Sequence, residues 1–77
     1  MKIEYKDDYL KMGLTIAYYR RLKGLTQEQL AKLVDTDTSV IGKLEAPNIP
    51  YAISLDMLFD VANALDVPAY KLLMFRE

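Results

Sequence analysis

Residues 25–45 decide the fold, and they read Leu-Thr-Gln-Glu-Gln-Leu-Ala-Lys-Leu-Val-Asp-Thr-Asp-Thr-Ser-Val-Ile-Gly-Lys-Leu-Glu. Thr26 precedes an apolar repeat, and Gln29 comes three residues after Thr26, which is the spacing of a capping box. We therefore expect a helix to begin here. Apolar residues recur at helical spacing as far as Val34, where this short second helix of the chain should end.

The next residues, Asp35-Thr36-Asp37, have the composition of a tight turn. Asp35 tolerates a left-handed backbone better than most non-glycine residues, and Asp37 can cap a third helix. We expect that helix over about residues 38–46, with Val40 or Ile41 and Leu44 buried, and Pro47 stopping it. Two short helices joined by a tight turn make a helix-turn-helix unit over about residues 26–46.

Helical patterns also lie on both sides of this unit. Toward the N-terminus, Asp7 or Asp8 can cap a first helix that ends at Lys23-Gly24, with Gly24 in the left-handed C-terminal turn. Residues 1–6 alternate in polarity and could form a short strand, but we favour a flexible tail. Toward the C-terminus, Ser54 can cap a fourth helix that ends at Asp66, and Pro68 fits the first turn of a fifth.

The expected fold is therefore all-α, a compact bundle of about five short helices in a single domain over residues 1–77. The inner face of the first helix should draw on Leu10, Gly13 or Leu14, Ile16, Ala17 and Tyr19, and that of the fourth on Leu55, Leu58, Val61, Ala62 and Leu65. In the fifth helix, Leu72, Leu73 and Phe75 are apolar. Met57, Phe59, Met74 and Phe75 are more typical of core positions than of a surface.

Composition limits the possible functions. The 77 residues include no cysteine and no histidine, so disulfides, thiolate zinc sites and histidine chemistry are absent. No carboxylate pair or glycine-rich phosphate loop indicates catalysis, and we expect neither an enzyme nor a cofactor, metal or small-molecule ligand. The sequence has no membrane-length apolar run and no signal peptide, which predicts a cytoplasmic protein without a membrane partner.

Charge gives a weaker indication. The net charge is −1, with +2 over residues 9–45, −1 before them and −2 after them. An acidic protein is not typical of nucleic-acid binders, although the positive share lies in the half that contains the helix-turn-helix unit.

The sequence resembles the Cro/repressor family, the lambda-repressor-like helix-turn-helix regulators of phages and bacterial chromosomes. The residues that carry the resemblance are Gly13, Ile16, Arg20, the run Gly24-Leu25-Thr26-Gln27-Glu28-Gln29-Leu30-Ala31, Ile41, Leu44 and Glu45, with apolar residues between Ser54 and Leu73. It covers roughly residues 10–75. The resemblance implies a DNA-binding transcriptional regulator, a small phage- or antitoxin-like repressor, that inserts its third helix into the major groove of double-stranded DNA, most often as a homodimer.

The resemblance also implies roles for individual residues. Gln27 matches a glutamine that contacts a DNA phosphate and braces the third helix, while Thr38, Ser39, Gly42 and Lys43 match the outward, DNA-facing positions of that helix. Arg20 and Glu45 match an ion pair between the first and third helices of many members, an architectural role. Each DNA-binding assignment has a plainer alternative, because glutamine, threonine and serine favour helix starts and surface lysines are usually just solvated.

The chain departs from the family pattern in ways that keep a second function open. Asp35 and Thr36 replace a glycine and an apolar residue, the third helix has no Arg, Asn or Gln, and residues 46–53 contain no basic residue. Gly42 offers no side chain to a base. The alternative is a protein-interaction module that keeps the fold but has weakened DNA binding, with Ile49, Tyr51 and Ile53 as an exposed apolar patch for a second subunit.

Overall fold

The computed structural model describes residues 1–75, and within them it contains four α-helices and two 3-10 turns. In chain order these are η1 (Ile3–Tyr5), α1 (Lys6–Leu22), α2 (Gln27–Leu33), α3 (Thr38–Glu45), α4 (Leu55–Leu65) and η2 (Ala69–Leu73). The all-α prediction is confirmed. Over the described residues, no helix is both long and apolar enough to cross a lipid bilayer.

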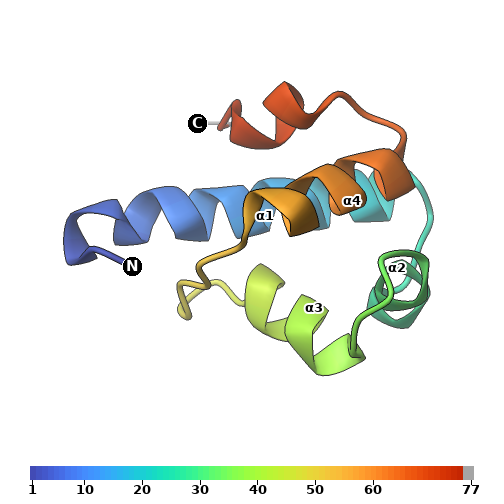
Figure 1. Ribbon diagram of the computed structural model, residues 1–77, viewed down its shortest axis with the longest axis horizontal. Helices are drawn as coiled ribbons and strands as arrows, with labels where there is room; N and C mark the ends of the chain where they lie inside the picture. The colour runs from blue at the N-terminus through green and yellow to red at the C-terminus, as the bar shows by residue number, and fades with distance from the viewer. Residues whose placement is uncertain (76–77) are drawn as a thin grey trace.

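The long helix α1 runs through the middle of the molecule along its longest axis (Figure 1). In that view α4 crosses in front of it, α3 lies below it, α2 lies at the lower right and η2 lies above. Both α3 and α4 contact α1, and α2 packs mainly on α3. The core between them consists of apolar side chains from every α-helix and η2, including Ile16, Leu30, Ile41, Leu58, Val61 and Leu72.

Three α-helices end in the same way, as the residue types predict. Gly24, Asp35 and Asp66 all have positive φ angles, 78°, 55° and 57°. In each case the N–H of the following residue donates to the carbonyl five residues earlier, as in the bond from Thr36 to Ala31. This Schellman pattern satisfies carbonyls that a helix end would otherwise leave unpaired.

Helix starts follow the predictions less evenly. Thr26 and Gln29 form the full capping box, with bonds of 3.0 and 2.8 Å, and Ser54 caps α4 through a 3.1 Å bond from Met57 N–H. Asp37 precedes α3, but its side chain makes no capping bond. The prediction for α1 is wrong: η1 runs directly into it, so the helix begins at Lys6 and neither Asp7 nor Asp8 is its cap.

Other expectations about the ends of the chain and the core also need correction. Residues 3–5 form a 3-10 turn, not a strand, and the expected mobility of residues 1–6 stays a prediction. The fifth helix is only the 3-10 turn η2. Gly13 faces inward while Leu14 is exposed, and Leu55, Phe59, Leu73 and Met74 are exposed too. Met57 and Phe75 are half-buried.

Candidate nucleic-acid interface

The candidate interface is the outer face of α3. Three of the predicted DNA-facing residues, Thr38, Ser39 and Lys43, are exposed there, while Gly42 is half-buried. Ile41, Leu44 and Glu45 are buried on the inner face, which settles the alternative between Val40 and Ile41 in favour of Ile41. The inner face fixes α3 to the core, and the outer face offers two hydroxyls, a threonine methyl and one ammonium to a ligand.

An ion pair fixes the angle at which α3 leaves the core. Arg20 of α1 donates from Nε to Glu45 Oε2 at 2.7 Å and from its terminal nitrogen Nη2 to Glu45 Oε1 at 2.9 Å. The two side chains are 9% and 3% exposed. Two parallel hydrogen bonds of this kind hold the guanidinium and the carboxylate in one plane. They are stronger than hydrogen bonds between neutral groups.

Two further hydrogen bonds extend this ion pair. The other terminal nitrogen of Arg20, Nη1, donates to the Leu25 carbonyl at 2.6 Å, in the turn between α1 and α2. Gln27 Nε2, at the start of α2, donates to Glu45 Oε1 at 3.0 Å. The Arg20–Glu45 pair therefore connects α1, the following turn, the start of α2 and the end of α3.

Gln27 lies against Gly42 as well as Glu45. A Cβ atom built on Gly42 would have Gln27 Oε1 as its nearest neighbour, at 3.8 Å. Gln27 is half-buried. Its amide nitrogen carries two hydrogens, of which one is engaged by Glu45, so the second remains able to donate to an outside acceptor.

A close approach between α1 and α3 completes the support of the site. A Cβ on Gly13 would overlap the carbonyl oxygen of Leu44, so only glycine fits at this position of α1. The motif comparison in the sequence included Gly13, but neither its periodicity nor its neighbours indicates a helix crossing. The bond from Arg20 to the Leu25 carbonyl also had no sequence signal, because it joins groups that only the tertiary fold brings together. The family resemblance predicted that Gln27 braces the third helix, but not that it does so through Glu45.

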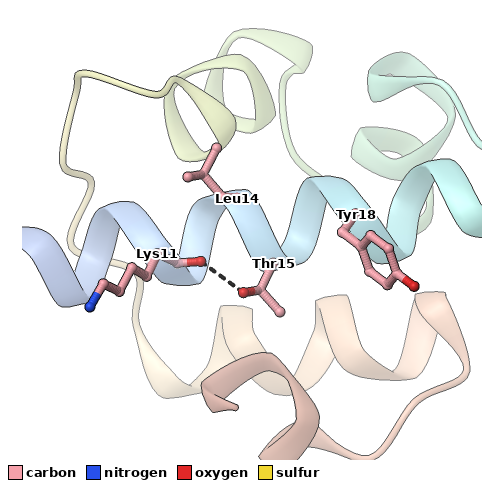
Figure 2. A pocket seen from close by; sticks show the side chains of 4 residues that line it. All are labelled: Lys11, Leu14, Thr15 and Tyr18. Atoms are coloured by element: carbon pink, nitrogen blue, oxygen red, sulfur yellow. Dashed lines mark hydrogen bonds between the residues drawn. The ribbon is translucent and has the colours of Figure 1, made fainter. Parts of the chain in front are cut away.

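The hollow on α1 shown in Figure 2 is not part of this interface. It has a volume of about 200 Å³ and is lined by Lys11, Leu14, Thr15 and Tyr18. Leu14 points to the side of α1 where α3 lies, whereas Thr15 and Tyr18 point to the other side (Figure 2). The Thr15 hydroxyl donates to the Lys11 carbonyl at 2.8 Å, so its proton is already engaged within α1.

The model of the family described as Helix-turn-helix matches residues 16–72, which run from the C-terminal part of α1 through α2, α3 and α4 into η2. The chain belongs to the helix-turn-helix family. Together with the solved structures described next, this match identifies a DNA-binding transcription regulator and confirms the family resemblance inferred from the sequence. No curated protein matches the sequence.

Two solved structures resemble the whole helix-turn-helix protein. One is the restriction-modification controller protein C.AhdI from Aeromonas hydrophila, with 35% identity and a TM-score of 0.79, covering 86% of this chain and 97% of that one. The other is the hypothetical transcription factor NHTF from Neisseria, with 28% identity and a TM-score of 0.80, covering 91% and 78% of the two chains. Both support a regulator over the alternative of an interaction module.

Proposed function

We propose that the chain is a homodimeric, sequence-specific repressor that places α3 in the major groove at each half of a two-fold operator. The observation that carries the proposal is the anchoring of α3. Its inner face is buried and joined to α1 and α2 through Glu45, while Thr38, Ser39 and Lys43 on its outer face are exposed. A recognition helix needs this combination, because base edges can be recognised only by side chains held at a fixed angle in the groove.

The exposed residues define what the helix would recognise. Lys43 can donate to guanine O6 or N7 or to a phosphate, and the Thr38 and Ser39 hydroxyls can donate or accept. The free N–H of the Gln27 amide would donate to a phosphate, with its direction set by the bond to Glu45. With a single cation on α3, affinity per subunit would be modest, which favours binding by two subunits together.

Exposed apolar side chains supply a surface for the second subunit. Leu55 and Phe59 on α4, and Tyr70, Leu73 and Met74 in or beside η2, are all exposed. The apolar patch predicted from the sequence, Ile49, Tyr51 and Ile53, is smaller than expected. Only Ile49 is exposed, while Tyr51 and Ile53 pack against the core. The proposal assigns no catalytic activity, since the helix-turn-helix family is regulatory.

The similarity to a restriction-modification controller suggests which genes to examine first. We propose that this chain controls transcription as a stand-alone regulator by occupying an operator. If a restriction-modification operon lies beside its gene, the promoter of that operon is the first place to look for the site.

Selection from random duplex DNA tests the proposal. The purified protein is incubated with random-sequence duplexes at two salt concentrations, and the bound fraction is amplified and sequenced. We expect a two-fold symmetric motif with half-sites ~34 Å apart and affinity that falls as salt rises. Absence of enrichment, together with no salt-dependent binding even at low ionic strength, would contradict it.

A further inference from the structure

A groove lies at one end of the molecule, away from the helix-turn-helix unit. Its volume is about 360 Å³, and it is lined by Tyr5, Asp8, Tyr9, Met12, Leu73 and Phe75. The two ends of the described chain thus form it together. All six residues lie outside the stretch 16–72 that matches the family model.

The residues just before the groove expose an apolar side chain. Ile3 is 87% exposed, and none of the three residues of η1 is buried. The turn runs directly into α1, and Lys6 N–H donates to the Ile3 carbonyl. An exposed branched apolar side chain is suited to insertion into a pocket on another molecule.

One pair of charges suits an exchange between two copies. Lys2 precedes Ile3 and Glu4 follows it, both exposed, and the exposed Asp8 lines the groove. Of the two residues beside Ile3, Lys2 is the one whose charge is complementary to Asp8 in the groove of a second copy. Because the projecting side chain and the groove belong to the same chain, a two-fold axis lets each copy fill the groove of the other.

We propose that Ile3 of each copy inserts into the groove of a second copy, with Lys2 facing Asp8. The inference rests on the homodimer proposed above and adds a contact beside the exposed apolar surface proposed there, with Leu73 common to both. The exchange is reciprocal, so the Ile3 side chain of each subunit fills the groove of the other.

The dimensions of the molecule agree with this contact. Residues 3–5 lie at one end of the longest axis, and α3 lies near its middle (Figure 1). That axis is 31 Å long. Two copies that meet at this end place their α3 helices roughly one molecular length apart, close to the ~34 Å between successive major grooves on one side of DNA.

A mixed disulfide tests the contact, and the absence of native cysteine makes the test clean. One full-length chain carries Ile3→Cys and a second, of different mass, carries Met12→Cys. The two are mixed, oxidised with a glutathione couple and examined by mass spectrometry. A disulfide needs Cα atoms about 4.4–6.8 Å apart, so the product reports direct contact. Tyr9→Cys serves as a second groove variant, because Met12 also packs against the core.

Leu22→Cys mixed with Ile3→Cys is the matched control, since Leu22 is also exposed, at 69%, but lies at the other end of α1. Sedimentation equilibrium of the wild type, Ile3→Ser and Leu22→Ser runs beside it. We expect the mixed disulfide with Met12→Cys or Tyr9→Cys only. For Ile3→Ser we expect a dimer dissociation constant at least about a hundredfold higher, because each dimer loses two buried isoleucine side chains.

The outcomes separate this inference from the proposed function. If a dimer forms but the mixed disulfide does not, and Ile3→Ser leaves the dimer dissociation constant unchanged, the exchange is overturned while the homodimeric regulator stands. A chain that stays monomeric both free and on its selected operator would overturn the homodimer itself, and the exchange with it.

Discussion

At the scale of single residues, the Glu45 carboxylate organises the recognition unit. It accepts two bonds from Arg20 and one from Gln27, and both carboxylate oxygens are used. The group is buried, so its charge is stabilised by these donors and not by water. The orientation of α3 and the direction of the Gln27 amide therefore depend on the same side chain.

Replacing Glu45 by alanine should lower the free energy of unfolding by about 3–5 kcal/mol, because it leaves the buried Arg20 charge without a partner. Urea unfolding followed by circular dichroism measures the change. Glu28→Ala is the control, since the Glu28–Lys32 pair is exposed, with a 3.7 Å separation, and should contribute only ~0.3–0.5 kcal/mol. Equal effects of the two substitutions would show that the buried ion pair is not structural.

Lys43→Ala should have the opposite pattern. The side chain is exposed on the outer face of α3, so its removal should leave the melting temperature nearly unchanged while weakening DNA binding. If Lys43 contacts a phosphate, the slope of log affinity against log salt should also fall by about 1. Fluorescence anisotropy on the selected operator measures both. Lys32→Ala, an exposed lysine on α2, is the control, and equal losses in the two variants would argue against a specific role for Lys43.

Residue types predicted part of this site and not the rest. Arg20 and Glu45 followed from family resemblance, and the inward position of Ile41 followed from periodicity with Val40 as its alternative. The bracing of α3 by Gln27 also followed from the resemblance, but its partner Glu45 did not. The bond from Arg20 to the Leu25 carbonyl did not follow either, because it depends on how the turn after α1 packs. Side-chain hydrophobicity also placed Leu55 and Phe59 in the core, whereas a helix on the surface exposes part of its apolar residues.

At the scale of elements, helix ends were more predictable than helix starts. Gly24, Asp35 and Asp66 each close a helix through a local left-handed turn, which depends on nearby residues alone. The start of α1 depends on η1, which continues directly into the helix. No capping residue in the sequence marks this start. The segment after Pro68 has apolar residues at helical spacing, yet five residues can make only a 3-10 turn, because helix nucleation is costly in so short a segment.

The crossing of α1 and α3 leads to a paired prediction about glycines. Gly13→Ala should destabilise the protein by about 1–3 kcal/mol, because its methyl group would overlap the Leu44 carbonyl and force the helices apart. Gly42→Ala has room at 3.8 Å from Gln27 Oε1 and should be neutral or stabilising by up to ~1 kcal/mol through helix propensity. Thermal unfolding of both variants tests the pair. A Gly13→Ala protein as stable as Gly42→Ala would contradict the close approach.

At the scale of the whole molecule, the fold separates two surfaces. The outer face of α3 lies on one side of α1, while η2 lies on the other and the groove beside it is formed by the chain ends (Figure 1). Such a separation allows two copies to associate without covering either recognition helix. Sequence periodicity predicted the helices of this arrangement, but the groove requires residues near positions 5 and 75 to meet, and no local pattern encodes that contact.

A rigid dimer fixes the distance between half-sites, which yields a prediction about DNA. Inserting five base pairs at the centre of the selected operator rotates one half-site by about half a turn, since B-DNA repeats every ~10–10.5 base pairs. We expect affinity to fall to that of an isolated half-site, as measured by electrophoretic mobility shift. An operator from which one half-site has been removed provides the comparison. Unchanged affinity after the insertion would indicate that the subunits bind independently.

Methylation interference on the selected operator shows directly whether α3 occupies the major groove. Dimethyl sulfate modifies guanine N7 in the major groove and adenine N3 in the minor groove, so bound and unbound DNA show which groove the protein occupies. We expect interference by guanine N7 methylation in two clusters one helical turn apart, lost at one position in each cluster when Lys43 is replaced by alanine. Interference confined to adenine N3, or none at either position, would contradict the placement of α3 in the major groove.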